Sequence, residues 1–207
     1  MKKYYLILSI ASYIAIMAAL YMAFVYAPTE KTMGDVQRIF YFHVPAAWVS
    51  FLGFAILAVA SGFFLGTGKH KWDKLAFAAA QVGTLFLTLV LITGPLWAKP
   101  VWGVYWTWDA RLTTSFILWL IYIAYLMLRN FVSDPERGAR FAAVFGIIGF
   151  VDVPIVYMSI RWWRTLHPSA VIGGGAGSGL APAMLQTLLV SVAAFTILFM
   201  TLLAFQY

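Results

Sequence analysis

The stretch of sequence that determines the fold class is residues 44–66, VPAAWVSFLGFAILAVASGFFLG, which contains no charged side chain. A helix needs roughly 20 consecutive apolar residues to cross the hydrocarbon core of a bilayer, and this run is long enough. Five further apolar runs follow the same pattern, separated by segments with proline, glycine and charged residues. The sequence therefore predicts membrane-spanning helices at about 4–27, 44–66, 75–98, 112–130, 141–162 and 181–205.

The composition of the whole chain is typical of a membrane protein. Of its 207 residues, 63% are hydrophobic and 10% are charged, whereas an average soluble domain has about a quarter charged residues. The segments between the runs are too short for a second core, so we expect a single membrane domain over 1–207. The first run is longer than the core of about 7 to 15 residues in a secretory signal, and we interpret it as the first membrane helix. The absence of cysteine excludes disulfides and thiolate metal sites.

Six crossings place both termini on one side of the membrane and the segments near Tyr41, Lys99 and Arg164 on the other. Short cytoplasmic loops are enriched in lysine and arginine. Eight of the 14 basic residues lie on the side of the termini, namely Lys2, Lys3, Lys69, Lys71, Lys74, Arg129, Arg137 and Arg140. The sequence thus predicts an all-α integral membrane protein, a bundle of six transmembrane helices with both termini cytoplasmic. Basic residues at helix ends suit membrane anchoring better than nucleic acid, so no nucleic-acid partner is expected.

An outer segment at about 97–112, between the third and fourth predicted helices, is dense in aromatic side chains. One interpretation is an interfacial belt, because Trp and Tyr favour the headgroup level of both membrane surfaces. A belt would occupy both faces, but seven of the nine tryptophans lie at or near the outer side: Trp48, Trp97, Trp102, Trp106, Trp108, Trp162 and Trp163. The other interpretation is a platform for a flat apolar ligand.

Two of the three histidines, His43 and His167, fall on the same predicted face as these tryptophans. Imidazoles on opposite sides of a porphyrin complete the axial coordination of its iron, so the pair indicates haem. Haem also has two propionates, which suit the forked donors of arginine. The arginines on this face are Arg38, Arg111, Arg161 and Arg164, and Arg111 is preferred because it adjoins the tryptophans.

Two aspartates have positions that call for an explanation. Asp109 stands just before the fourth helix, where a carboxylate either caps the first free amides or takes part in the site. Asp152 lies near the middle of the fifth run beside Pro154, a depth at which an ionisable group is costly and a functional role is the default hypothesis. We assign it no chemistry. The glycine-rich stretch 173–179 lacks the lysine of a phosphate loop, so nucleotide binding is not expected.

The run WGVYWTWDARLT at 102–113 resembles the tryptophan-rich WWD domain of proteins that handle haem in cytochrome c-type biogenesis. With FHVP at 42–45 and WWRTLH at 162–167, the chain is similar to the CcmC family, the smallest branch beside CcmF and CcsA. This resemblance implies a protein of the bacterial inner membrane that binds haem b at its periplasmic face, with His43 and His167 as axial ligands. The expected cofactor-binding set also includes Trp97, Trp102, Gly103, Tyr105, Trp106, Trp108, Asp109, Arg111, Arg38 and Arg164.

The same resemblance implies haem transport by delivery, without enzymatic turnover. The haem would pass to the chaperone CcmE, in partnership with CcmD and the transporter subunits CcmA and CcmB. A first alternative is a b-type cytochrome membrane subunit of a quinone-linked oxidoreductase, although such proteins usually carry axial histidines within membrane helices. A second alternative is a structural subunit whose tryptophans only anchor it in the bilayer, in which case replacing either histidine leaves the haem content unchanged.

Overall fold

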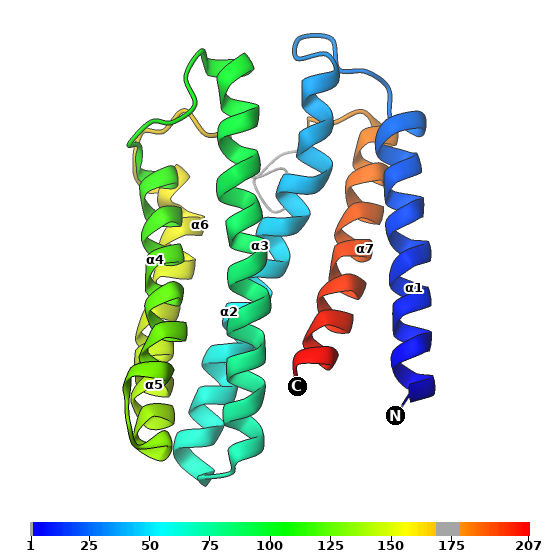
Figure 1. Ribbon diagram of the computed structural model, residues 1–207. Helices are drawn as coiled ribbons and strands as arrows, with labels where there is room; N and C mark the ends of the chain where they lie inside the picture. Colours follow the sequence, from blue (N-terminus) through cyan, green and yellow to red (C-terminus); the bar gives the residue numbers. More distant parts are fainter. Residues whose placement is uncertain (1, 169–178) are drawn as a thin grey trace. The chain divides into compact units, whose positions relative to one another are not determined.

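A computed structural model describes residues 2–168 and 179–207, so most of the glycine-rich stretch lies outside the described residues. Within these described residues, six helical segments are long and apolar enough to span a membrane, which confirms the prediction of an all-α protein with six transmembrane helices (Figure 1). The helices are α1 (Lys2–Tyr21), continued by the π-helical turn η1 (Met22–Tyr26), the short η2 (Asp35–Ile39), α2 (Phe40–Thr67), α3 (His70–Trp102), α4 (Ala110–Phe131), α5 (Pro135–Phe150), α6 (Asp152–Trp162) and α7 (Pro182–Gln206).

Two helices differ from the sequence-based expectation. The fifth predicted helix is divided into α5 and α6, and the Val151 amide at the break bonds the Ile148 carbonyl at 3.1 Å. Pro154 follows the break and has no N–H for the helical hydrogen-bond pattern, which gives a physical reason for the break between α5 and α6. The third helix runs on through two prolines to Trp102, because membrane helices tolerate proline when other groups satisfy the freed carbonyls. It ends at Gly103, whose φ of 78° favours glycine.

The chain forms two compact units. Unit 1 consists of Met1–Val49, Leu89–Thr107 and His167–Phe205, and unit 2 consists of Ser50–Thr88, Trp108–Leu166 and Gln206–Tyr207. Helices α2 and α3 therefore contribute one part to each unit. The single membrane domain over 1–207 stays a prediction.

In unit 1, α1 and α7 lie side by side and antiparallel (Figure 1). The rings of Tyr5 and Phe205 stack with their centroids 5.0 Å apart near one end of the pair. Near the other end, the Tyr26 hydroxyl donates a hydrogen bond to Gln186 Oε1 at 2.6 Å. The first residues of α1 and the last residues of α7 thus share one end of this unit.

The opposite end of unit 1 contains an apolar cluster that joins four helices. Its buried members are Ala23, Ala27, Phe40, Tyr41, Met184 and Leu188, and Trp97 of α3 packs against them. Four segments therefore meet here: the end of α1, the starts of α2 and α7, and the last part of α3. We call this end of unit 1 the His43 end. Counting crossings predicts that the segments near Tyr41 and Lys99 share a side, and the packing within unit 1 agrees.

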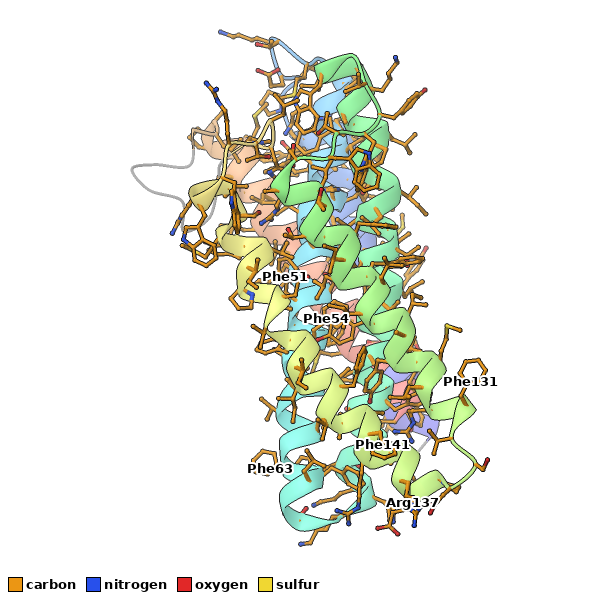
Figure 2. The ribbon with its side chains drawn as sticks, turned by 90° about the vertical axis from the view of Figure 1, so that its left-hand side faces the viewer. Phe51, Phe54, Phe63, Phe131, Arg137 and Phe141 are labelled. Atoms are coloured by element: carbon orange, nitrogen blue, oxygen red, sulfur yellow. The ribbon has the colours of Figure 1, made fainter. Side chains whose placement is uncertain are left out.

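In unit 2, α5 presents small residues to its neighbours, and its buried residues are Gly138, Ala139, Ala142, Ala143, Gly146 and Gly149. A Cβ added at Gly146 would lie 2.6 Å from Leu57 Cδ2 and 3.1 Å from Tyr125 Cε2, so a larger side chain would force these neighbours to shift. Such small residues allow close approach of helices in membranes, where packing drives association. Phe54 of α2 stacks on Tyr122 of α4 with centroids 3.6 Å apart, and Figure 2 shows Phe54 among the helices, whereas Phe131 stands away from them.

We expect Gly146→Leu to lower the free energy of unfolding by about 2 kcal/mol, because overpacking forces neighbouring side chains to shift. The measurement is thermal unfolding in detergent. Gly62→Leu is the matched control, since an added Cβ at Gly62 meets nothing within 4 Å. Equal destabilisation by both substitutions would mean that close packing at Gly146 does not matter.

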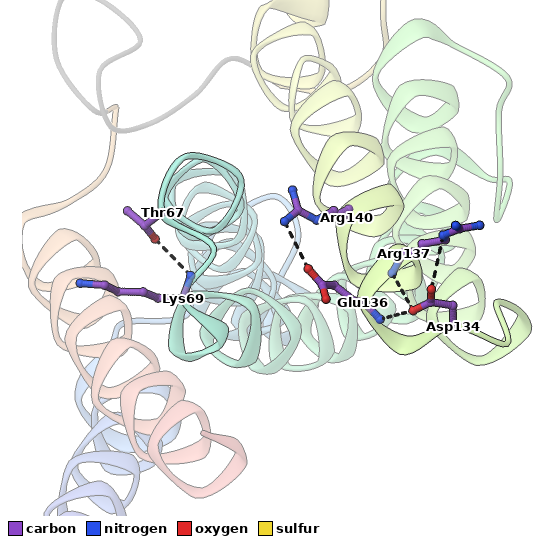
Figure 3. Close-up of polar contacts among 6 residues, drawn as sticks. All are labelled: Thr67, Lys69, Asp134, Glu136, Arg137 and Arg140. Atoms are coloured by element: carbon purple, nitrogen blue, oxygen red, sulfur yellow. Dashed lines mark hydrogen bonds and ion pairs between the residues drawn. The ribbon is translucent and has the colours of Figure 1, made fainter.

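Local hydrogen bonds stabilise the loops at the end of unit 2 where α2 ends and α3 and α5 begin (Figure 3). Asp134 caps α5 by accepting from the amides of Glu136 at 2.9 Å and Arg137 at 3.3 Å. The Thr67 hydroxyl oxygen accepts from the Lys69 amide at 3.3 Å in the turn between α2 and α3. These contacts satisfy the free amides that begin a helix or a turn.

Candidate functional site

His43 lies one turn inside α2 and is buried. Its Nδ1 is 2.9 Å from Thr93 Oγ1 of α3. The Thr93 hydroxyl donates its own proton to the Leu89 carbonyl at 2.7 Å, so its oxygen accepts the hydrogen bond from His43. Nδ1 therefore carries a proton, and in the neutral ring the lone pair belongs to Nε2. This is the arrangement in which a second residue orients a metal-binding imidazole.

Helix α3 supplies the surface against which the His43 ring packs. The Trp97 ring meets His43 edge to face, with centroids 5.9 Å apart, and Phe40 meets Trp97 in the same way at 6.0 Å. A Cβ added at Gly94 would lie 3.4 Å from His43 Cε1, so the glycine lets the imidazole lie against the helix backbone. The Thr93 hydroxyl and the Trp97 indole therefore both hold the imidazole in place.

The first half of the tryptophan-rich segment also belongs to unit 1. Gly103 ends α3, and its carbonyl accepts a hydrogen bond from Lys99 Nζ at 2.8 Å. The same ammonium lies 5.3 Å from the centroid of the exposed Tyr105 ring, which is a cation–π distance. Trp102 and Trp106 are partly buried. The role visible for Gly103 is to shape the backbone that presents these rings.

Asp109 of unit 2 begins α4 and binds two segments. One carboxylate oxygen accepts from the Leu112 amide at 3.1 Å and caps the helix, one of the two roles expected for it. The other oxygen accepts from the Leu166 amide at 3.4 Å. Leu166 directly precedes His167, so the carboxylate fixes the backbone next to that histidine. Trp108 beside it is 74% exposed.

His167 is partly buried and lies outside the helices. Its Nδ1 is 2.9 Å from the Pro168 carbonyl oxygen, which accepts only, so Nδ1 is the donor here too. In the neutral ring the lone pair again belongs to Nε2. The acceptor at Nδ1 thus favours the same tautomer in both histidines, and both belong to unit 1.

Arg38 and Glu30 hold the loop between η1 and η2. The Arg38 guanidinium pairs with Asp35 at 3.0 Å and donates to Thr29 Oγ1 at 3.2 Å and to the carbonyls of Ala23 and Ala27. The hydrogen bond that the Met33 amide donates to Glu30 lowers the pKa of that carboxyl below its ordinary value. Most of the hydrogen-bond donors of Arg38 therefore stabilise the conformation of this loop.

The arginines of unit 2 differ in what they contact. Arg111 donates a hydrogen bond to the Val156 carbonyl of α6, two residues after Pro154. Arg161 lies 5.7 Å from the centroid of the Tyr157 ring. Arg164 is exposed. Arg161 is exposed as well, whereas Arg111 is partly buried.

The predicted site residues fall into both units. Unit 1 contains His43, His167, Trp97, Trp102, Gly103, Tyr105, Trp106 and Arg38, and unit 2 contains Trp108, Asp109, Arg111 and Arg164. Only some of them are in contact, above all His43 with Trp97. Thr93 and Gly94, which orient His43, were not predicted. Their signal in the sequence is a polar and a small residue together in an apolar run, one turn before Trp97.

The fold and the site together define an integral membrane protein of six spanning helices, with a histidine held against a tryptophan where its second helix begins. A family described as Heme exporter protein C matches residues 1–207, and the chain belongs to this family.

Curated relatives agree with the family match. The chain is similar to Heme exporter protein C of Bradyrhizobium diazoefficiens, at 44% identity over 85% of the chain and 67% of the relative. It is similar to the protein of that name in Escherichia coli strain K12, at 36% identity over 94% and 78%. A Marchantia polymorpha protein named as a ccmC-like mitochondrial protein of cytochrome c biosynthesis is 40% identical over 74% and 65%. The chain therefore spans about two thirds of the length of two of these relatives.

Proposed function

We propose that this protein binds haem at the His43 end and delivers it for the maturation of c-type cytochromes. The observation that carries the proposal is the His43 imidazole, whose Nδ1 proton is held by Thr93 so that Nε2 carries the lone pair. The names of the relatives support haem as the cargo and cytochrome c biosynthesis as the process. The protein is then a membrane transport component that binds and releases, without enzymatic turnover.

His43 and His167 are the proposed axial ligands of a haem b. Each has a hydrogen-bond acceptor at Nδ1, which favours the tautomer with the lone pair on Nε2 and strengthens the imidazole as an iron ligand. Trp97 packs on the side of His43, and Trp102, Trp106 and Trp108 form the proposed platform for the porphyrin and the chaperone CcmE. Asp109 supports the platform by capping α4 and holding Leu166.

The proposed propionate partners are Arg164, Arg111 and Arg38, in that order. Arg164 is exposed, whereas the other two already bind protein carbonyls. Tyr105 and Gly103 shape the platform edge with Lys99. The site is proposed to face the periplasm from the inner membrane, with both termini cytoplasmic and with CcmD, CcmA and CcmB as partners.

The experiment is transfer of haem from the purified, reconstituted protein to the soluble domain of the chaperone. The expected result is a low-spin haem spectrum in the membrane protein that decays as haem appears on the chaperone. A protein that takes up no haem, or never loses it to the chaperone, would contradict the proposal.

A b-type cytochrome subunit is the second candidate, and the position of His43 favours it. His43 lies within α2 rather than before it, and ligands within membrane helices are usual in such cytochromes. His167 lies outside the helices and fits delivery better. Stable haem that is reduced by quinol and retained in the presence of the chaperone would identify the cytochrome.

We expect Thr93→Val to weaken haem binding by about 10-fold to 100-fold, as losses of such orienting partners do. Valine keeps the size of the side chain and leaves the Nδ1 proton of His43 without its acceptor. Thr93→Ser keeps the hydroxyl and should bind nearly as tightly as the wild type. Haem titration followed by absorption measures both, and equal affinity of the valine and serine variants would exclude an orienting role.

A further inference from the structure

Three aromatic rings in unit 2 form a continuous series that begins in the tryptophan-rich segment. The rings of Trp108 and Phe116 meet edge to face with centroids 6.3 Å apart, and those of Phe116 and Trp119 stack at 6.0 Å. Trp108 is largely exposed, and Phe116 and Trp119 are partly exposed. We call these three residues the aromatic ladder.

The ladder reaches a depth at which tryptophan is unusual. Trp119 is nine residues beyond the start of α4, which is about 14 Å along a helix. That is close to half of the roughly 30 Å hydrocarbon core, whereas tryptophan prefers the interface. Trp119 is therefore not placed as an interfacial anchor.

A hydrogen bond within unit 2 stabilises the Trp119 indole at this depth. Trp119 Nε1 donates to Thr88 Oγ1 at 2.8 Å, and the Thr88 hydroxyl donates to the Thr84 carbonyl at 2.8 Å. Satisfying the indole N–H inside the protein removes the main cost of placing it in hydrocarbon. Phe116 and Trp119 remain partly exposed, next in sequence to the exposed Ile117 and Leu120.

We propose that haem dissolved in the outer half of the bilayer reaches the tryptophan-rich segment along the aromatic ladder. This inference rests on the proposed function and adds the source of the haem and its path. A planar macrocycle gains offset or edge contacts from each ring in turn, and the polar propionates remain toward the headgroups. The ladder ends at Trp108, which belongs to the tryptophan-rich segment and is one of the proposed platform residues.

The test measures the rate of haem uptake by the full-length protein in liposomes. Haem is supplied either from protein-free donor vesicles of the same lipid or from serum albumin in the aqueous phase. The readouts are the rate and final amplitude of the low-spin absorption band. Trp119→Leu and Phe116→Leu should slow uptake from vesicles about fivefold, in line with the loss of one aromatic contact, with unchanged final amplitude.

Phe131→Leu is the matched control, because Phe131 ends the same helix at its other end and is 75% exposed (Figure 2). It should load at the wild-type rate. Trp119→Phe keeps a ring and should also load nearly normally, which keeps the inference testable if the leucine variant fails to fold.

Wild-type rates of haem uptake in both leucine variants would overturn the proposed path along the ladder. Equal slowing of uptake from vesicles and from albumin would also overturn it. Either result would leave the proposed function intact as long as the final spectrum forms. Absence of that spectrum in the wild type would instead contradict the proposed function itself.

Discussion

Replacing either His43 or His167 with alanine is expected to abolish the low-spin spectrum of bound haem. Two axial imidazoles make the haem iron low-spin. With one imidazole removed, the sixth coordination position is empty or holds a weakly bound water, and the iron is no longer low-spin. The loss of affinity should exceed that of Thr93→Val, since the ligand itself is removed rather than its orienting partner. The measurement is the absorption spectrum of each purified variant, ferric and ferrous, with the double variant beside them.

Exogenous imidazole distinguishes loss of a ligand from loss of the fold. A cavity left by a missing imidazole should accept free imidazole, so the low-spin bands should return in both single variants. His70→Ala is the control, because His70 begins α3 in unit 2, is exposed, and should bind haem like the wild type. Unchanged spectra in the single variants would mean that iron is held elsewhere and that the proposed site is wrong.

Much of the fold could be predicted because lipid imposes a strong rule on sequence. A spanning helix must be long and apolar, so all six were found from their runs alone. Helix ends were less predictable. Lys99 and Pro100 suggest a loop, yet α3 continues to Trp102, where the positive φ of Gly103 ends it. Local charge and proline are weaker signals than continued packing and hydrogen bonding.

The candidate site rests on residue types that the sequence makes conspicuous, whereas the contacts of those residues could not be predicted. The two histidines and the tryptophans stand out because such residues are scarce elsewhere in the chain. The roles of Arg38 and Arg111 were not visible, because the carbonyls that they bind lie 11 or more residues away in the sequence. Thr93 and Gly94 were missed for the same reason, since their importance arises only when α2 and α3 pack together.

Replacing Asp73 with alanine is expected to lower the free energy of unfolding by about 3 to 5 kcal/mol, because it leaves a partly buried arginine without its counter-charge. Asp73 at the start of α3 pairs with Arg129 near the end of α4, and Arg129 Nη2 lies 3.0 Å from Asp73 Oδ2. The two terminal guanidinium nitrogens both donate to the carboxylate, and the guanidinium also lies 4.6 Å from the centroid of the Phe77 ring. This bidentate pair joins the start of α3 to the end of α4 in unit 2.

The exposed pair of Arg140 with Glu136, at 3.2 Å, provides the matched control (Figure 3). Glu136→Ala should cost less than about 1 kcal/mol, as surface pairs do, because water already screens both charges. Replacing Asp73 and Arg129 together by alanine and methionine should recover part of the loss, since no uncompensated charge then remains buried. Denaturation in mixed micelles measures the free energy of unfolding of all three variants. If Asp73→Ala costs no more than Glu136→Ala, the pair contributes nothing beyond a surface contact, and the junction of α3 with α4 depends on its apolar packing alone.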